Sequence, residues 1–363
     1  MAGIGRFIAA RLLNASITLI VALVFISTIY AVYSVKEKQA AVEEQYVFMA
    51  RQLQQKYKDP RELQEALKKL KESLMRQYGV TGSFYHDVIN DVKRQLLAVF
   101  TFDFGTSRNR YFGTTDIGEQ VKIALKNTVI LFTTATIITS IIGILLGLYM
   151  ARKPGGVLDR TVSILGMVSW SLPTWWVGIL FLLIFSFYLG WFPTQAKEVY
   201  AALQAIPENL PLYTRLFLEL KTWLYYMALP LITIVSVSVG GWAYVVRTIV
   251  LETMQQDFVI AARARGLPER RVIYGHVLRT SSPPIVANVA LSLVGSFGGA
   301  IITETVFGWP GMGLLYWVAL LNSEVNVLIA TTALVVILFV ALVYTLDFIY
   351  MLLDPRVRTH ETV

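Results

Sequence analysis

Six long stretches without a charged residue set the strongest constraint on the fold of this chain. Each reaches or exceeds the roughly 20 apolar residues that a helix needs to cross a bilayer. Continuous apolar runs favour helices over the alternating strands of a membrane barrel, because a helix satisfies its own backbone hydrogen bonds in lipid. We therefore expect an all-α integral membrane protein with six transmembrane helices. The stretches are residues 12–35, 127–151, 161–196, 222–246, 280–303 and 325–346.

The basic residues indicate how these helices are oriented. In a six-span arrangement they concentrate on one side, which the positive-inside rule assigns to the cytoplasm. Both termini are then cytoplasmic in a multi-pass protein of the cell membrane, with the first span inside residues 1–35 and a C-terminal tail at residues 355–363. The net charge of +8 reflects this topology, and no nucleic-acid partner is expected. The cytoplasmic side carries Arg6, Arg11, Arg152, Lys153, Arg160, the basic residues from Arg263 to Arg279, Arg356 and Arg358.

Residues 36–118 are the largest polar part of the chain and are assigned to the extracellular side. Apolar residues recur there at steps of three and four, which predicts two amphipathic helices hinged at Asp59 and Pro60, and a third helix over residues 85–99. Two interpretations stay open for this helical insert. It is a cap that packs its own apolar stripes together, or it is a docking surface for an external partner.

An enzymatic function finds no support among the residue types that carry chemistry. The three histidines, His86, His276 and His360, lie outside the expected spans, and no metal-binding spacing or nucleophile motif accompanies them. The chain also lacks the GxxxxGK[ST] loop that binds the phosphates of ATP. We therefore expect no catalytic residue, no metal site and no cofactor bound by this chain. Uphill transport would then need energy from a partner or from an ion gradient.

A strongly basic segment separates the fourth and fifth expected spans. Helical spacing places Phe258, Ala261, Ala262 and Arg265 on one face. Gly266 suits the end of that helix, and a second helix is expected to follow the turn. From the residues alone the segment is either a docking helix for another protein or an amphipathic loop that lies on anionic lipid.

The same segment resembles the ATPase-docking motif of ABC importer permeases. That motif reads Glu-Ala-Ala, three residues, Gly, nine residues and Ile-x-Leu-Pro, and here the chain has Ile260-Ala261-Ala262, then Gly266, then His276-Val277-Leu278-Arg279. The glutamate and the final proline are replaced, so a contact that needs that carboxylate is not carried over. A variant form in permeases of dipeptide and oligopeptide importers, D-[YF]-V-x-x-A-R-A-K/R-G-L-x-E-R-R-V, fits residues 257–272.

Other segments are similar to the same family, in the same order along the chain. They extend the resemblance over residues 6–358, and only residues 36–77 look enlarged. The chain is thus similar to the permease subunits of dipeptide/oligopeptide-type ABC importers, whose family imports peptides, nickel complexes or oligosaccharides. The segments are residues 102–107 (FDFGTS), 171–175 (SLPTW), 189–193 (LGWFP), 304–313 (ETVFGWPGMG) and 353–358 (LDPRVR).

The resemblance implies the type I ABC importer permease fold for residues 119–354, and a set of partner chains. These are a second homologous permease, two cytoplasmic ATPases that bind ATP and Mg, and an extracellular solute-binding protein. The implied cargo is an oligopeptide, with an oligosaccharide as the alternative; an ion-coupled secondary transporter is less favoured. The spans of this core are expected near residues 125–151, 161–188, 222–248, 280–303 and 326–350, and the cytoplasmic coupling segment at 251–279. The implied ATPase-coupling residues are Asp257, Phe258, Ala261, Ala262, Arg265, Gly266 and Leu267.

Six residues near the third and fifth expected spans are candidates for the gate or the translocation path. Trp170 and Trp175 either line a path or pack between helices, and Pro173 either bends its helix or is accommodated by packing. An acid near the end of a span is a functional candidate, and Glu304 is expected to order residues 308–313 as a re-entrant plug or an outer gate. The candidates are Trp170, Pro173, Trp175, Glu304, Trp309 and Pro310.

Overall fold

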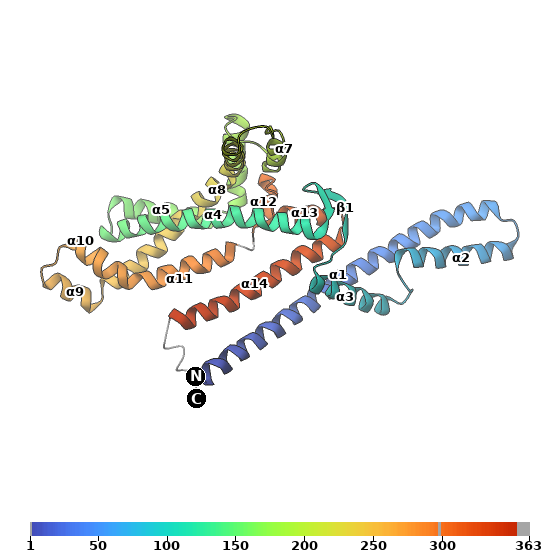
Figure 1. The fold of residues 1–363 in the computed structure, drawn as a ribbon, viewed down its shortest axis with the longest axis horizontal. Helices are drawn as coiled ribbons and strands as arrows, with labels where there is room; N and C mark the ends of the chain where they lie inside the picture. Colours follow the sequence, from blue (N-terminus) through green and yellow to red (C-terminus); the bar gives the residue numbers. More distant parts are fainter. Residues whose placement is uncertain (1, 297–298, 354–363) are drawn as a thin grey trace.

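The computed structural model describes residues 2–296 and 299–353, and most of them are helical. Figure 1 shows long helices that run through most of the molecule. The expected tail at residues 355–363 lies outside the described residues, as does most of the 353–358 segment. The long helices are α1 (Ala2–Lys56), α4 (Ile117–Arg152), α8 (Leu212–Met254) and α14 (Val325–Leu353).

All four long helices contain a stretch that is long and apolar enough to cross a membrane. A fifth candidate is α5 (Val157–Ser171) together with α6 (Thr174–Phe181) and its continuation as the π-helix η1 (Leu182–Tyr188), but the two halves are bent by 98°. The break falls at Leu172-Pro173, because the residue before a proline is disfavoured in helical geometry. The expected third span is therefore a broken helix rather than a straight one.

The expected fifth span is divided into α11 (Leu278–Ser296) and α12 (Ile301–Phe307). The first turns of α11 contain Arg279, three hydroxyl residues and the pair Pro283-Pro284, which lower its hydropathy, and α11 is not among the candidate spans. The described helices thus supply four or five candidate spans, and the number six stays a prediction.

The insert is helical, and its first helix is the continuation of α1. No break occurs at the expected boundary between residues 35 and 36. The predicted hinge lies where α1 ends, because the Asp59 side chain accepts a hydrogen bond from Arg61 N at 2.8 Å and Pro60 occupies the first position of α2. In Figure 1, α2 folds back along the C-terminal half of α1, and the two project away from the other helices. The remaining insert helices are α2 (Pro60–Tyr78) and α3 (Phe84–Thr101).

The apolar stripes of the insert pack together. Val42 of α1, Leu74 of α2 and Val80 form a buried cluster. Helix α3 is held against α1 by Lys38, whose ammonium lies 3.0 Å from the buried carboxylate of Asp91. This packing fits the interpretation of the insert as a cap, and it leaves the interpretation as a docking surface untested.

A short β-hairpin joins the insert to α4 and was not expected from the sequence. Strands β1 (Thr106–Tyr111) and β2 (Thr114–Asp116) are antiparallel, and the turn between them has positive φ at both Phe112 (52°) and Gly113 (86°). Such a two-residue turn matches the twist of a hairpin, and glycine adopts it without strain. Asp116 then caps α4 by accepting a hydrogen bond from Glu119 N at 2.7 Å.

The hairpin is fastened to the beginning of α14 by one buried carboxylate, that of Glu324. Its oxygens accept hydrogen bonds from Arg108 N (3.1 Å), Asn109 N (3.1 Å), Asn109 Nδ2 (2.7 Å) and the Tyr111 hydroxyl (3.1 Å). Four donors compensate the cost of burying this charge. The strand β1 therefore keeps its place through a residue that lies 216 positions beyond Arg108.

Small residues let the long helices approach one another closely. A methyl group on Gly147 of α4 would lie 2.6 Å from the Ala243 carbonyl oxygen of α8. Likewise, one on Gly166 of α5 would lie 2.6 Å from the Gly240 carbonyl carbon of α8. Such crossings, in which only a small side chain fits, are typical of helices that associate in membranes.

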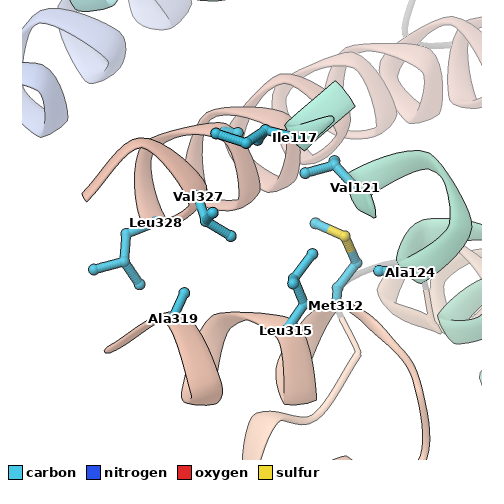
Figure 2. Close-up of a cluster of buried hydrophobic side chains, with 9 residues drawn as sticks. Ile117, Val121, Ala124, Met312, Leu315, Ala319, Val327 and Leu328 are labelled. Atoms are coloured by element: carbon cyan, nitrogen blue, oxygen red, sulfur yellow. The ribbon is translucent and has the colours of Figure 1, made fainter. Parts of the chain in front are cut away.

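Helices α4, α13 and α14 meet at a buried cluster beside the hairpin (Figure 2). Figure 2 shows Ile117 and Val121 of α4 facing Leu315 and Met312 of α13, with Val327 of α14 beside them. This cluster makes the hairpin end of the molecule one packed unit. The remaining helical segments are η2 (Ala196–Glu198), α7 (Val199–Gln204), α9 (Asp257–Ala264), α10 (Glu269–Arg271), η3 (Val272–Val277) and α13 (Met312–Leu321).

Candidate coupling segment and gate

The basic segment between α8 and α11 folds as a short helix, a tight turn and a second helical run. Gly266 follows α9 with φ of 76°, donates from its N–H to Arg263 O at 2.9 Å, and lets Leu267 N reach Ala262 O at 3.4 Å. This pair of hydrogen bonds is the Schellman arrangement that ends helices at a left-handed glycine. The turn expected at Gly266 is therefore present.

The inner face of α9 packs on its own chain. Val259 and Ala262 are buried in a cluster that includes Val246 and Val250 of α8, and Leu267 is half-buried against it. Ala262 was expected on the docking surface, but the structure turns its methyl group inward, where a partner has no access to it. It belongs to the buried cluster that joins α9 to α8.

The outer face of α9 carries the other expected coupling residues. Asp257, Phe258, Ala261 and Arg265 are exposed, as is Gly266 in the turn. Phe258 is 38% exposed and places a large apolar group on this outer face. A short rigid helix with an apolar anchor and a small residue beside it is suited to the groove of another protein.

Two features of this segment were missed in the sequence analysis. Ile260 is 56% exposed and adds a second apolar group to the outer face. Arg263 pairs with Glu269 across the turn, with Nη2 and Oε1 2.7 Å apart. The guanidinium holds the pKa of Glu269 below its ordinary value, and the carboxylate raises the pKa of Arg263. Because both groups are partly exposed, the pair contributes less than about 1 kcal/mol to stability.

Glu304 is fully buried and holds the loop that follows α12. Its Oε1 accepts a hydrogen bond from Thr128 Oγ1 at 2.8 Å, and its Oε2 accepts from Gly313 N at 2.6 Å and Leu314 N at 3.3 Å. The carboxylate thus satisfies free amides at the beginning of α13, where the helix dipole also favours a negative charge. Gly311 lies so close that a methyl group on it would be 2.4 Å from Oε2.

The loop 308–313 is tied to α4 as well. The buried indole of Trp309 donates from Nε1 to Asn127 O at 3.1 Å, and Asn127 Nδ2 donates to Pro310 O at 2.8 Å and to the Tyr200 hydroxyl at 2.6 Å. Asn127 and Thr128 were missed in the sequence analysis, although two adjacent polar residues at the edge of an apolar stretch were a visible signal. These bonds hold the loop against α4.

The structure gathers only part of the predicted gate. Glu304, Trp309 and Pro310 form one site, whereas Trp170 of α5 and Trp175 of α6 lie on opposite sides of the bend at Pro173. Among the residues that the structure describes, no hydrogen bond joins either tryptophan to the loop. Trp170 is 61% exposed, and its ring packs against Gly241 of α8. A methyl group on Gly241 would lie 2.0 Å from Trp170 Cε3.

No ligand site for a metal ion emerges from the described ranges 2–296 and 299–353, where no group of three or more His, Cys, Asp or Glu side chains comes together suitably. The chemistry available at the loop is instead hydrogen bonding and apolar contact.

The sequence is similar to a family of transport proteins and to several of its members. Residues 143–359 match the model of a family described as "Binding-protein-dependent transport system inner membrane component". The chain is 26% identical over 288 residues to the Oligopeptide transport system permease protein AppB of Bacillus subtilis. The aligned region covers 79% of this chain and 85% of AppB. It is 29% identical over 220 residues to the Di/tripeptide transport system permease protein DppB of Pseudomonas aeruginosa, and this region covers 60% of this chain and 66% of that protein. Over 233 residues it is 28% identical to the Dipeptide transport system permease protein DppB of Escherichia coli, and this region covers 62% of this chain and 68% of that protein.

Proposed function

The chain belongs to the family of binding-protein-dependent transport system inner membrane components, and on that premise we propose that it forms one transmembrane half of the translocation path in an ATP-driven importer of oligopeptides. A second permease completes the path. Two ATPases on the cytoplasmic side supply the energy, and an extracellular solute-binding protein delivers the cargo. Both termini lie in the cytoplasm.

One observation carries the proposal, namely the way α9 is built. Its inner residues Val259 and Ala262 anchor it to α8, while Phe258, Ile260 and Ala261 are presented to a partner. The sequence has no phosphate-binding loop of its own, so energy from ATP has to enter through contact with another chain. A helix fixed on one face and open on the other is suited to pass on a movement of that partner.

The cargo assignment is supported by the relatives, whose names describe oligopeptide, di/tripeptide and dipeptide permeases. An oligosaccharide remains the alternative cargo, because the exposed rings of Trp170 and Trp175 offer faces on which sugars stack. Uptake assays with a labelled tetrapeptide and a labelled oligosaccharide decide between the two.

The test of coupling uses the whole transporter in membrane vesicles. We expect Ala261→Arg to abolish both co-purification of the ATPases and ATP-dependent uptake, because a long charged side chain replaces a small one on the docking face. Ala40→Arg makes the same change at an exposed helical alanine of the insert and should leave both unchanged. Full assembly of the Ala261→Arg transporter would contradict the proposal and would favour a segment that only lies on lipid.

A further inference from the structure

A pocket of about 420 Å³ opens beside the gate loop, on the side of the molecule that carries the insert. It lies between the turn of the β-hairpin, helix α7 and helix α13. Phe112 and Tyr200 form its aromatic walls, and Leu315 and Val318 of α13 contribute aliphatic surface. Its volume is in the range of small-ligand pockets, roughly 300–1,000 Å³. Neither the family match nor the coupling segment accounts for it.

The charges at this pocket have one sign. Arg110 and Lys197 line it, and no acidic side chain of the described residues does so. The Nε of Arg110 donates to Gly113 O at 2.6 Å, which orients the guanidinium. In the described part of the chain no hydrogen bond or ion pair occupies its terminal nitrogens or the Lys197 ammonium. The site therefore favours an anionic group attached to an apolar one, and it repels an ammonium group.

The pocket is connected to the gate through Tyr200. The hydroxyl of Tyr200 accepts the hydrogen bond from Asn127, whose side chain also holds Pro310 O. The rings also form a continuous series: Phe112 to Tyr200 at 6.2 Å between centroids, Tyr200 to Trp223 at 5.9 Å, and Trp223 to Trp309 at 5.9 Å. A ligand against Tyr200 thus touches a group that holds the loop closed.

We infer that this pocket is a subsite for the C-terminal residue of a peptide, occupied before the peptide passes the loop. The carboxylate lies on Arg110 and Lys197, and an apolar side chain lies between Phe112, Tyr200 and Val318. The inference rests on the proposed function for the identity of the cargo. The pocket itself recognises only a carboxylate next to an apolar side chain, so binding of a ligand to the pocket can be measured without transport.

The experiment is photo-crosslinking of the assembled membrane complex in nanodiscs, without the solute-binding protein. The probe is N-acetyl-glycyl-photoleucine with a free carboxylate, and its C-terminal amide is the matched probe. Labelled peptides are identified by mass spectrometry. We expect the acid to label the pocket about tenfold more than the amide, a factor typical of one lost charge-assisted hydrogen bond. In the double variant Arg110→Gln/Lys197→Gln this preference should disappear, with labelling by the amide unchanged.

Two controls isolate the charge. The double variant Arg108→Gln/Lys122→Gln removes two cations from the hairpin and the beginning of α4, outside the pocket, and should keep the preference. Arg110→Lys keeps the positive charge and should therefore keep the preference for the acid probe. That result would exclude damage to the hairpin turn as the cause of the lost preference in the Arg110→Gln/Lys197→Gln variant. Equal labelling by acid and amide in the native complex, or a preference that survives Arg110→Gln/Lys197→Gln, would overturn the inference. Peptide uptake without pocket labelling would refute the subsite alone, whereas labelling without ATP-dependent uptake would refute the transport proposal alone.

Discussion

Replacing Glu304 with alanine should release the loop 308–313 from its packed position against α4. The change removes the acceptor of the Gly313 and Leu314 amides and one partner of Thr128. A buried donor left without an acceptor costs about 1–3 kcal/mol. The Leu314 bond is long at 3.3 Å, so we take about 3 kcal/mol for the two amides together. That free energy raises the population of the open loop by about a hundredfold.

Glu304→Gln separates hydrogen bonding from charge. The amide oxygen of glutamine still accepts from Gly313 N, and its Nε2 faces Thr128 Oγ1, which can accept as well as donate. We expect a cost of about 1 kcal/mol and a change in loop opening of less than about tenfold. ATP-dependent uptake should then stay close to that of the native chain.

The assay is thiol labelling of a single cysteine. The native chain has no cysteine, so Met312→Cys, at a position that is 3% exposed, reports opening without background. Tyr213→Cys, at an exposed position, gives the rate for full access. Alanine at position 304 should accelerate labelling of the buried cysteine by about a hundredfold. If it does not, the carboxylate does not hold the loop, and if glutamine accelerates labelling as much as alanine does, the charge and not the hydrogen bonds is what matters.

Three further outcomes follow from contacts elsewhere in the chain. Gly166→Leu should lower the thermal stability of the purified chain strongly, by several kcal/mol, because its side chain meets backbone of α8; an unchanged melting temperature would refute the close crossing. Because Arg263 lowers the pKa of Glu269, the stability from this pair is complete above the ordinary glutamate pKa and is lost as pH falls through the lowered one. Thermal unfolding of native and Glu269→Gln chains should thus differ by less than about 1 kcal/mol at pH 7 and converge at acid pH. Glu324→Ala should abolish hydrogen-exchange protection of the Asn109 amide, and retained protection would show that the hairpin holds without the carboxylate.

Local signals made some of this architecture predictable. Asp59-Pro60 combines a capping side chain with a residue suited to the first turn of a helix, and the structure begins α2 there. Gly266 follows a short helical pattern, and the structure ends α9 there. At each place the decisive information lies within a few residues, which is why the sequence alone suffices.

The partners that hold the hairpin and the loop 308–313 in place could not be identified from local signals alone. Strand β1, with the sequence TSRNRY, has no alternation of apolar and polar residues, and its place depends on Glu324, 215 positions beyond Asn109. Thr128 likewise meets Glu304 across 176 positions. The burial of Ala262 depends on side chains of α8, so spacing within α9 identified its faces but not which one is covered. The position of β1, the contact between Thr128 and Glu304 and the burial of Ala262 therefore all depend on residues that are distant in the sequence.

Helix α8 links the coupling segment to the gate within one element. Near its C-terminal end, Val246 and Val250 hold α9, and near its N-terminal end Trp223 packs its ring 5.9 Å from that of Trp309. Some 27 residues separate Val250 from Trp223, about 40 Å along a helix. The helix runs unbroken through Pro230, whose surroundings are buried. If an ATPase moves α9, α8 must carry that movement to Trp309 unless it bends at Pro230, because the packed glycine crossings with α4 and α5 leave it little freedom to deform elsewhere.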